Sequence, residues 1–298
     1  MRRPCYVVDS FAARPMTGNP AGVLLDGADL DAQAMQRIAG ELKHSETAFP
    51  LPAREPTAAL HLRWFTPASE VAFCGHATLA AFHVLVEEAG RIRVPEGGLT
   101  RTAFTCKSGK LEVELSRRGG KLQILIETPA SRFETVQVPA ALAGALGLVP
   151  EALDPGLPPQ KSMILEGNLY LAVRDRETLA RCRPDGVALE HLGKQLGVAG
   201  FVVYSLHPAA GVDAAMRCFF PGYGILEDPV TGSAAGQLGA LIQVAIPERL
   251  PRKLVFSQGD EMGRPGRIDV EVRSERDGAV RGFIGGNAIT ILRGELAL

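Results

Sequence analysis

A single glutamate, Glu46, begins an otherwise apolar segment, ETAFP. A carboxylate in such a segment is poorly solvated, and loss of solvation raises its pKa toward neutrality, where it can both accept and release a proton. A structural explanation is also open, because Ser45 and Glu46 lie just beyond the end of a predicted helix, where polar residues are common. The sequence therefore makes Glu46 a candidate general acid/base, with helix capping as the alternative.

Two glycine-containing motifs are each predicted to begin a helix, GHATLAAFHVL from Gly75 and GSAAGQLGAL from Gly232. Backbone N–H groups at a helix start carry partial positive charge and bind anions such as a carboxylate or an enolate oxygen. Glycine also lets a ligand approach the backbone closely. We therefore expect Gly75, His76, Gly232 and Ser233 to contact substrate, although a lone histidine is more often structural and neither motif is a phosphate-binding loop.

Asp228 and Cys74 stand next to these helix starts. Asp228 belongs to EDPVTGSAAG, where its alternative role is that of a turn residue before Pro229. Cys74 directly precedes Gly75, and a thiol before a helix N-terminus has a lowered pKa and can carry protons. A buried cysteine without a chemical role is the simpler interpretation of Cys74. Asp228 is thus a candidate catalytic residue, and Cys74 a candidate auxiliary acid/base.

The elements that position these residues occur twice along the chain. The pattern R-x-F-x-P is found at 63–67 (RWFTP) and again 154 residues later at 217–221 (RCFFP). The same offset relates Met35, Ile38 and Leu42 to Leu189, Leu192 and Leu196, and each set has the spacing of the buried stripe of an amphipathic helix. Each helix precedes a predicted strand, SETAFPL or GFVVYSL. The repetition predicts an internal duplication.

The duplication predicts an α+β fold. Two similar domains, related by a pseudo-two-fold axis, would each wrap a mainly antiparallel sheet or barrel around a central helix. Residues 1–127 form the first predicted half and residues 128–298 the second, with the boundary at Thr128-Pro129. The tail, 284–298, is also suited to pack back onto the first half.

Positions that break the repeat point to chemistry, because symmetric positions mostly serve the fold. Glu46 corresponds to Gly200, and Asp228 corresponds to Val71. A pair of similar domains makes a cleft between them, and such clefts are favoured ligand sites. We therefore expect the active site in an inter-domain cleft.

Composition excludes several classes of partner. The 298 residues carry 32 Lys and Arg against 33 Asp and Glu, so there is no charge bias toward nucleic acid or anionic membranes. No apolar run is long enough to span a bilayer, and the N-terminus lacks the apolar core of a signal peptide. The five cysteines form no C-x-x-C pair, which favours reduced thiols in the cytoplasm over disulfides or zinc. The six histidines show no metal-ligand spacing, so no metal is expected.

Five segments in order resemble the phenazine biosynthesis-like (PhzF-like) isomerases: DSFAARPMTGNPAGVLL, HSETAF, FTPASEVAFCGHATLAAFHVL, FFPGYGILEDPVTGSAAG and SQGDEMGRPGRI. The resemblance extends from residue 6 to about residue 295. It implies the diaminopimelate epimerase fold, no cofactor, a homodimer, and a central glutamate that moves a proton. Under this resemblance Glu46 is the proton shuttle. The substrate-holding and assisting residues are then Asn19, Ser45, Gly75, His76, Asp228, Gly232 and Ser233.

The segment SEVAFCGH is also similar to the first catalytic-cysteine motif of diaminopimelate epimerase. In that enzyme two cysteines exchange protons across one carbon. Here Cys74 takes the first position, but Thr231 stands at the second. Relatives with a cysteine and a threonine are associated with dehydration, so this resemblance keeps a lyase reaction open.

The sequence thus predicts a cofactor-independent isomerase that moves a proton on a small carboxylate-bearing substrate. One alternative is a Cys74-dependent epimerase or dehydratase of a small amino or hydroxy acid. The other is a small-molecule binding protein without turnover.

Overall fold

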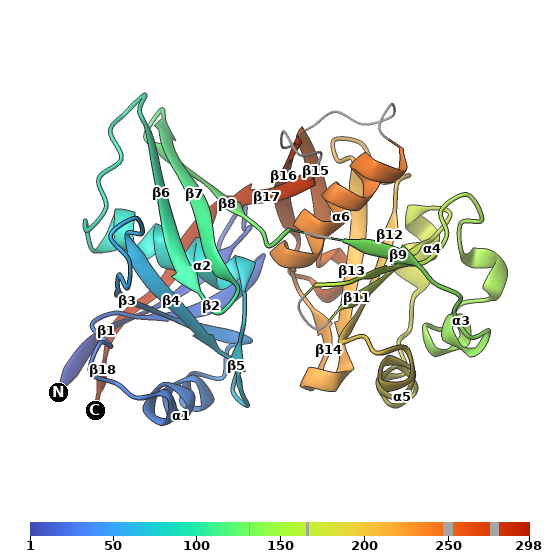
Figure 1. Cartoon of the computed structure of the whole chain (residues 1–298), viewed down its shortest axis with the longest axis horizontal. Coiled ribbons are helices and arrows are strands. Elements are labelled where there is room, and N and C mark those ends of the chain that lie inside the picture. Colours follow the sequence, from blue (N-terminus) through green and yellow to red (C-terminus); the bar gives the residue numbers. More distant parts are fainter. Residues whose placement is uncertain (131, 165–166, 247–252, 275–279) are drawn as a thin grey trace. The chain divides into compact units, whose positions relative to one another are not determined.

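The computed structural model describes residues 1–130, 132–164, 167–246, 253–274 and 280–298. Two compact units are formed (Figure 1). The first contains Met1–Thr128 together with Phe283–Leu298, and the second contains Pro129–Gly282. None of the helices in the described ranges has the length and apolar character that a membrane span requires.

The first unit is built mostly of strands. In chain order its elements are β1 (Arg2–Ser10), β2 (Asn19–Leu24), α1 (Ala32–Leu42), β3 (Glu46–Pro52), β4 (Leu60–Phe65), β5 (Glu70–Val71), α2 (Gly75–His83), the π-helical turn η1 (Val84–Glu88), β6 (Leu99–Cys106), β7 (Gly109–Arg118), β8 (Lys121–Glu127), the end of β17 (Val280–Gly286) and β18 (Ala288–Ala297).

Strand pairing in this unit follows the order β18–β1–β2–β3–β4–β6–β7–β8–β17. The pairs are antiparallel except β2–β3 and β4–β6, which are parallel. Helix α2 packs against β1, β2, β3, β8 and β18, and its residues from Gly75 to Phe82 are all buried. A helix with no solvent-facing side must be mainly apolar, as GHATLAAF is apart from His76 and Thr78. The Thr78 hydroxyl is satisfied within the helix start, since it donates to the Cys74 backbone oxygen at 2.6 Å. The sheet therefore wraps around α2.

Helix α1 has the buried stripe that the sequence predicts, and local signals mark both of its ends. Asp31 caps its start, since the Asp31 side chain accepts a hydrogen bond of 2.7 Å from the backbone N–H of Ala34. Met35 and Ile38 are buried against the sheet. The helix ends at Lys43, whose φ of 56° lies in the left-handed region, and this turn delivers the chain into β3.

The second unit has the same kinds of element. They are β9 (Phe133–Thr135), α3 (Ala141–Ala145), η2 (Pro150–Ala152), β10 (Gln160–Ser162), β11 (Asn168–Ala172), α4 (Arg176–Arg181), α5 (Gly186–Leu196), β12 (Gly200–Ser205), β13 (Ala214–Phe220), η3 (Pro221–Tyr223), β14 (Ile225–Asp228), α6 (Gly232–Ala245), β15 (Lys253–Gln258), η4 (Asp260–Met262) and β16 (Gly266–Ser274).

Several elements of the two units correspond, although α3 and α4 have no helical counterpart among the described residues of the first unit. Helix α5 lies at the offset of 154 from α1, and β12 and β13 begin at the same offset from β3 and β4. The two parallel pairs of the first unit recur as β11–β12 and β13–β15. Helix α6 corresponds to α2 and is buried along most of its length. The predicted α+β class, with a mainly antiparallel sheet around a central helix, is confirmed in each unit.

A mostly buried ion pair marks the same place in both units. In the first, Arg63 donates two hydrogen bonds to Glu70, of 2.7 and 3.0 Å. In the second, Arg217 donates two to Glu227, of 2.8 and 2.7 Å. Each arginine is the first residue of the R-x-F-x-P pattern and lies over the phenylalanine ring of that pattern, at 5.0 and 5.3 Å. The shared motif therefore ties β4 to β5 and β13 to β14, just before each central helix begins.

Candidate active site

Glu46 is the first residue of β3, and its backbone pairs with Ala21 in the parallel ladder between β2 and β3. The strand residues that follow it, from Thr47 to Pro50, are buried, whereas the Glu46 side chain is 14% exposed. The carboxylate thus lies where the strand emerges from the core. This placement agrees with the poorly solvated position that the sequence predicts.

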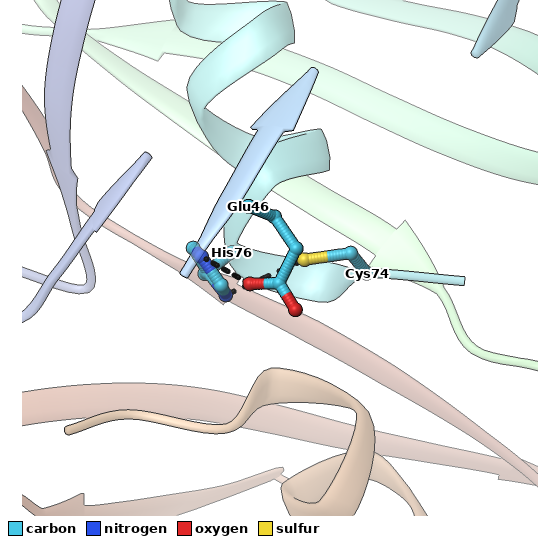
Figure 2. A group of neighbouring side chains, drawn as sticks. All are labelled: Glu46, Cys74 and His76. Carbon is cyan, nitrogen blue, oxygen red and sulfur yellow. Dashed lines mark hydrogen bonds and ion pairs between the residues drawn. The ribbon is translucent and has the colours of Figure 1, made fainter. Parts of the chain in front are cut away.

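Cys74 and His76 reach the same point from the start of α2. Figure 2 shows the three side chains pointing toward one another, Glu46 from β3 and the other two from the beginning of the helix. The Glu46 Oε2 atom lies 3.2 Å from His76 Nε2. Cys74 Sγ lies 3.4 Å from the other ring nitrogen, His76 Nδ1. The imidazole therefore contacts a carboxylate through one nitrogen and a thiol through the other.

The buried position of His76 favours the neutral form of its ring. Burial, together with the charge of His44 nearby, lowers the pKa of His76 to about 3. The contact with Glu46 is consequently a hydrogen bond between a neutral imidazole and a carboxylate, not an ion pair. His76 is buried at the helix start and is held from β1 as well, because Ser10 Oγ donates to its backbone oxygen at 2.7 Å.

Asn19 and Ser45 complete a network around the imidazole. Asn19 Nδ2 lies 3.3 Å from His76 Nδ1, and Ser45 Oγ lies 3.3 Å from His76 Nε2. Ser45 Oγ also donates to Asn19 Oδ1 at 3.3 Å. Asn19 is fully buried at the start of β2, which favours a positioning role for it over direct contact with substrate. Ser45 is half-buried beside Glu46.

The N-terminus of α2 has the features of an anion site. Its N-cap residue, Cys74, has an extended backbone and makes no side-chain capping hydrogen bond. Backbone N–H groups in the first turn of a helix have no partner within the helix, so the groups after Cys74 are not satisfied by a cap. The expected role of Gly75 and His76 in holding an anion stays a prediction that this geometry supports.

In the second unit, Asp228 ends β14 and lies four residues before α6 begins at Gly232. Thr231 Oγ1 donates a hydrogen bond of 2.5 Å to Asp228 Oδ2. Thr231 is also the N-cap of α6 and, like Cys74, makes no side-chain capping bond to the helix. Gly232 is buried and Ser233 is half-buried in the first turn. The inter-domain cleft in which the two helix starts are expected to meet stays a prediction.

Gln258 is a residue that the sequence did not single out. Its side-chain Oε1 accepts from the Thr231 backbone N–H at 2.8 Å, and its Nε2 donates to the Asp228 backbone oxygen at 2.8 Å. Gln258 thereby holds the turn between β14 and α6. Gln258 belongs to the motif SQGDEMGRPGRI. A separation of 27 residues from Thr231 does not by itself indicate that the two residues are in contact. Ser10, which supports His76 from β1, was missed for the same reason.

The second unit has no space for a counterpart of Glu46. A side-chain carbon at Gly200 would lie 2.2 Å from Cε1 of Phe220, so only glycine fits there. The position equivalent to Phe220 in the first unit is Thr66, which is far smaller. The asymmetry between Glu46 and Gly200 is therefore built into the packing.

Among the residues that the structure describes, Glu46, Cys74 and His76 form a group that could offer ligands to a metal ion, since one donor atom from each lies within 4.8 Å of the others. The geometry is poor for a single ion, because Glu46 lies at Nε2 of the imidazole and Cys74 lies at Nδ1. An ion bound at about 2.0–2.3 Å takes one nitrogen of a ring, so side chains would have to rotate. The set fits a proton-transfer network better than a metal centre.

Several known proteins are similar to this chain in sequence and in fold. The family model of phenazine biosynthesis-like proteins (PhzC-PhzF) matches residues 8–294. A protein of Salmonella typhimurium named "Uncharacterized isomerase YddE" is 32% identical over 304 residues, which cover 100% of this chain and 99% of that protein. A PhzF-family crystal structure from Bacillus anthracis has a TM-score of 0.88 at 26% identity and covers 100% of both chains.

The fold is shared more widely than the sequence. The structure of a probable proline racemase from Agrobacterium radiobacter has a TM-score of 0.71 at 14% identity, covering 99% of this chain and 93% of that one. This likeness shows the predicted racemase and epimerase type of fold. Because the family model covers nearly the whole chain and full-length relatives are named isomerases, the alternative of a binding protein without turnover is not retained. The chain belongs to the phenazine biosynthesis-like (PhzC-PhzF) family and is an enzyme of the isomerase type.

Proposed function

We propose that the enzyme is a cofactor-independent isomerase of a small carboxylate-bearing substrate, with Glu46 as general acid/base. The observation that carries the proposal is the placement of Glu46. Its carboxylate is mostly buried, it contacts a neutral His76 at 3.2 Å, and it lies beside the uncapped start of α2. A carboxylate that only capped a helix would not need to contact the hydrogen-bond network around His76.

The proposed step moves a proton without oxidation or reduction. Glu46 removes a proton from carbon next to a carboxylate or conjugated system, and the C–H electron pair enters that system. Backbone N–H groups at Gly75 and His76 stabilise the developing negative charge. The protonated Glu46 then returns the proton to another carbon of the same system. Atoms and charge balance, and the bond order along the substrate shifts.

Residues of the second unit are proposed to hold the substrate. Thr231 Oγ1 donates to the Asp228 carboxylate, and Gln258 Nε2 donates to Thr231 Oγ1 and to the Asp228 backbone oxygen, so the carboxylate is held in place through Thr231. Such a fixed group suits a hydroxyl or ammonium group of a substrate. Gly232 and Ser233, in the first turn of α6, are proposed to contact a carboxylate.

The proposal is tested by identifying what the enzyme binds and following its protons. Metabolite mixtures of small carboxylic acids are incubated with the protein in deuterated water, and deuterium incorporation is measured by mass spectrometry. A compound that gains deuterium with wild-type enzyme and not with Glu46→Gln supports the proposal. Equal incorporation by both proteins rejects Glu46 as the acid/base.

The contact between Cys74 and His76 favours a second candidate, a Cys74-dependent epimerase or dehydratase. Cys74 Sγ lies 3.4 Å from His76 Nδ1, and a neighbouring imidazole can activate a thiol. Under this second function, Cys74→Ala and Cys74→Ser abolish proton exchange with solvent. Under the favoured function, both variants keep most of it.

Two further properties are proposed from the sequence resemblance and the cysteines. The enzyme is proposed to be a homodimer, which light scattering on the purified protein tests directly. All five cysteines are buried free thiols, and this supports a reducing, cytoplasmic compartment as the place of action.

A further inference from the structure

The hydrogen-bond donors around His76 can be assigned by counting protons. Ser45 has one hydroxyl proton, and it donates that proton to Asn19 Oδ1. Toward His76 Nε2, at 3.3 Å, Ser45 can therefore only accept. A nitrogen that meets an acceptor must carry a proton itself. The contact with Ser45 thus places the proton of the neutral ring on Nε2.

The other contacts of the ring agree with this assignment. Because Asn19 Oδ1 accepts from Ser45, the Asn19 amide directs its Nδ2 donor at His76 Nδ1. Nδ1 must then be the unprotonated nitrogen. Nε2, which carries the proton, faces the acceptor oxygen Oε2 of Glu46 at 3.2 Å. One tautomer satisfies all these partners, and the opposite tautomer would set a bare nitrogen against the Glu46 carboxylate.

We propose that Asn19 is a positioning residue that holds His76 as the neutral Nε2–H tautomer, so that Glu46 is supported by a neutral donor instead of a cation. The inference rests on the proposed function for its purpose, which is to keep Glu46 able to accept a proton. An imidazolium beside Glu46 would stabilise the ionised carboxylate and weaken it as a base. Asn19 prevents this, because its N–H group already points at the nitrogen that would take the second proton.

The hydrogen bond from Asn19 to His76 also disfavours Cys74 as a base. A thiolate of Cys74 would need a proton donor at His76 Nδ1, and that nitrogen is the one at which Asn19 donates. The titratable groups that face the ring are Glu46 from β3, His44 from the preceding turn, and Cys74 from the start of α2. Of these, Glu46 favours a charged ring and His44 opposes it. The Asn19 amide, which directs its N–H dipole at Nδ1, also favours the neutral ring.

The test reads the tautomer directly and needs no substrate. Long-range proton–nitrogen correlation spectra of the isotope-labelled full chain distinguish a protonated from an unprotonated ring nitrogen, and a pH titration follows each histidine. We expect His76 of the wild type to be neutral near pH 7 with the proton on Nε2. In Asn19→Leu the donor to Nδ1 is gone, and the midpoint of the His76 titration should rise by about 1 pH unit. In Asn19→Asp a carboxylate faces each nitrogen, and the rise should be larger.

Thr47→Val is the matched control. Thr47 is fully buried one residue from Glu46, and its hydroxyl has no hydrogen-bond partner among the described residues. Its removal should leave the tautomer and the titration of His76 unchanged. If the Asn19 variants do not fold, the wild-type spectrum still decides, since a proton on Nδ1 or a charged ring near pH 7 overturns the proposal. An unchanged titration in folded Asn19→Leu also overturns it.

These outcomes are separate from those of the proposed function. A wild-type ring with the proton on Nε2, together with deuterium exchange that survives Glu46→Gln, would keep the tautomer assignment and reject the acid/base role of Glu46. A wild-type ring with the proton on Nδ1, together with loss of deuterium exchange in Glu46→Gln, would keep the role of Glu46 and reject Asn19 as the residue that sets the tautomer.

Discussion

Replacing Glu46 by glutamine is the perturbation that separates chemistry from folding most cleanly. The change keeps the shape of the side chain and removes only its charge and its ability to carry a proton. The amide oxygen of glutamine can still accept from His76 Nε2, at the distance of 3.2 Å that Glu46 Oε2 has now. Nothing in the packing of β3 needs to move.

The expected magnitudes follow from this geometry. A hydrogen bond to a charged acceptor is worth about 1.5–3 kcal/mol and one to a neutral acceptor about 0.5–1.5 kcal/mol, so the bond to His76 weakens by about 1 kcal/mol. Relief of a poorly solvated charge offsets part of that loss. The free energy of unfolding should therefore change by less than about 1 kcal/mol. Turnover should fall by roughly 10²–10⁴, the usual contribution of a positioned general acid/base.

The assay compares two variants in parallel. Deuterium incorporation into a substrate found for the enzyme gives the activity, and urea unfolding gives the stability. Glu70→Gln is the control, because Glu70 is a mostly buried carboxylate in the same unit. Glu70 forms ion pairs with Arg63 and Lys107 and makes no ion pair with His76. The free energy of unfolding of Glu70→Gln should fall by about 1–3 kcal/mol, because the ion pair with Arg63 loses one of its charges. The deuterium incorporation of this variant should stay at the wild-type rate.

Two results would refute the reasoning about Glu46. The first is exchange at the wild-type rate in Glu46→Gln, which would move the search for the base to Asp228, His76 and Cys74 in that order. The second is a loss of stability in Glu46→Gln as large as that in Glu70→Gln, which would show that the carboxylate serves the fold.

Three further predictions concern pH, the thiol and the second unit. The folded-state pKa of His76, about 3, lies below the unfolded value of about 6.5, so the unfolded state binds more protons between these values. Stability should therefore fall as the pH drops from about 6.5 toward 3, and His76→Gln should make this fall shallower in urea titrations at several pH values. Cys74→Ala should keep at least about half of the deuterium exchange, and complete loss would favour the Cys74-dependent function. Asp228→Asn weakens the charge-assisted bond from Thr231 and should lower the free energy of unfolding by about 1 kcal/mol, measured by urea unfolding; an unchanged midpoint would contradict the hydrogen-bond assignment.

Acid should also weaken the first unit through Glu70. Burial raises the pKa of Glu70, but the hydrogen bonds from Arg63 and Lys107 outweigh burial and hold that pKa below its ordinary value. A lowered carboxyl pKa contributes stability that is complete above the unfolded value and is lost as the pH falls through the folded value. The acid loss expected from His76 therefore begins at higher pH than the loss expected from Glu70.

The sequence alone determined the features that are local or periodic. The start of α2 at Gly75 and of α6 at Gly232 follows from glycine ahead of a run of small apolar residues. The buried stripe of α1 follows from helical spacing, and the repeat made its counterpart α5 visible. The same repeat singled out Glu46, because comparison with Gly200 showed that the fold itself does not require a carboxylate there.

Only the tertiary structure decided how the candidate residues meet. Asn19 lies 57 positions before His76, and Gln258 lies 27 positions after Thr231, so neither contact has a spacing signal. Such contacts are set by strand register, which places Asn19 beside the start of α2. The sequence shows that Gly200 lacks a side chain, and the structure shows that the Phe220 ring fills the space. Side-chain packing between distant segments leaves no periodic trace in the chain, and for that reason the tautomer of His76 became visible only in three dimensions.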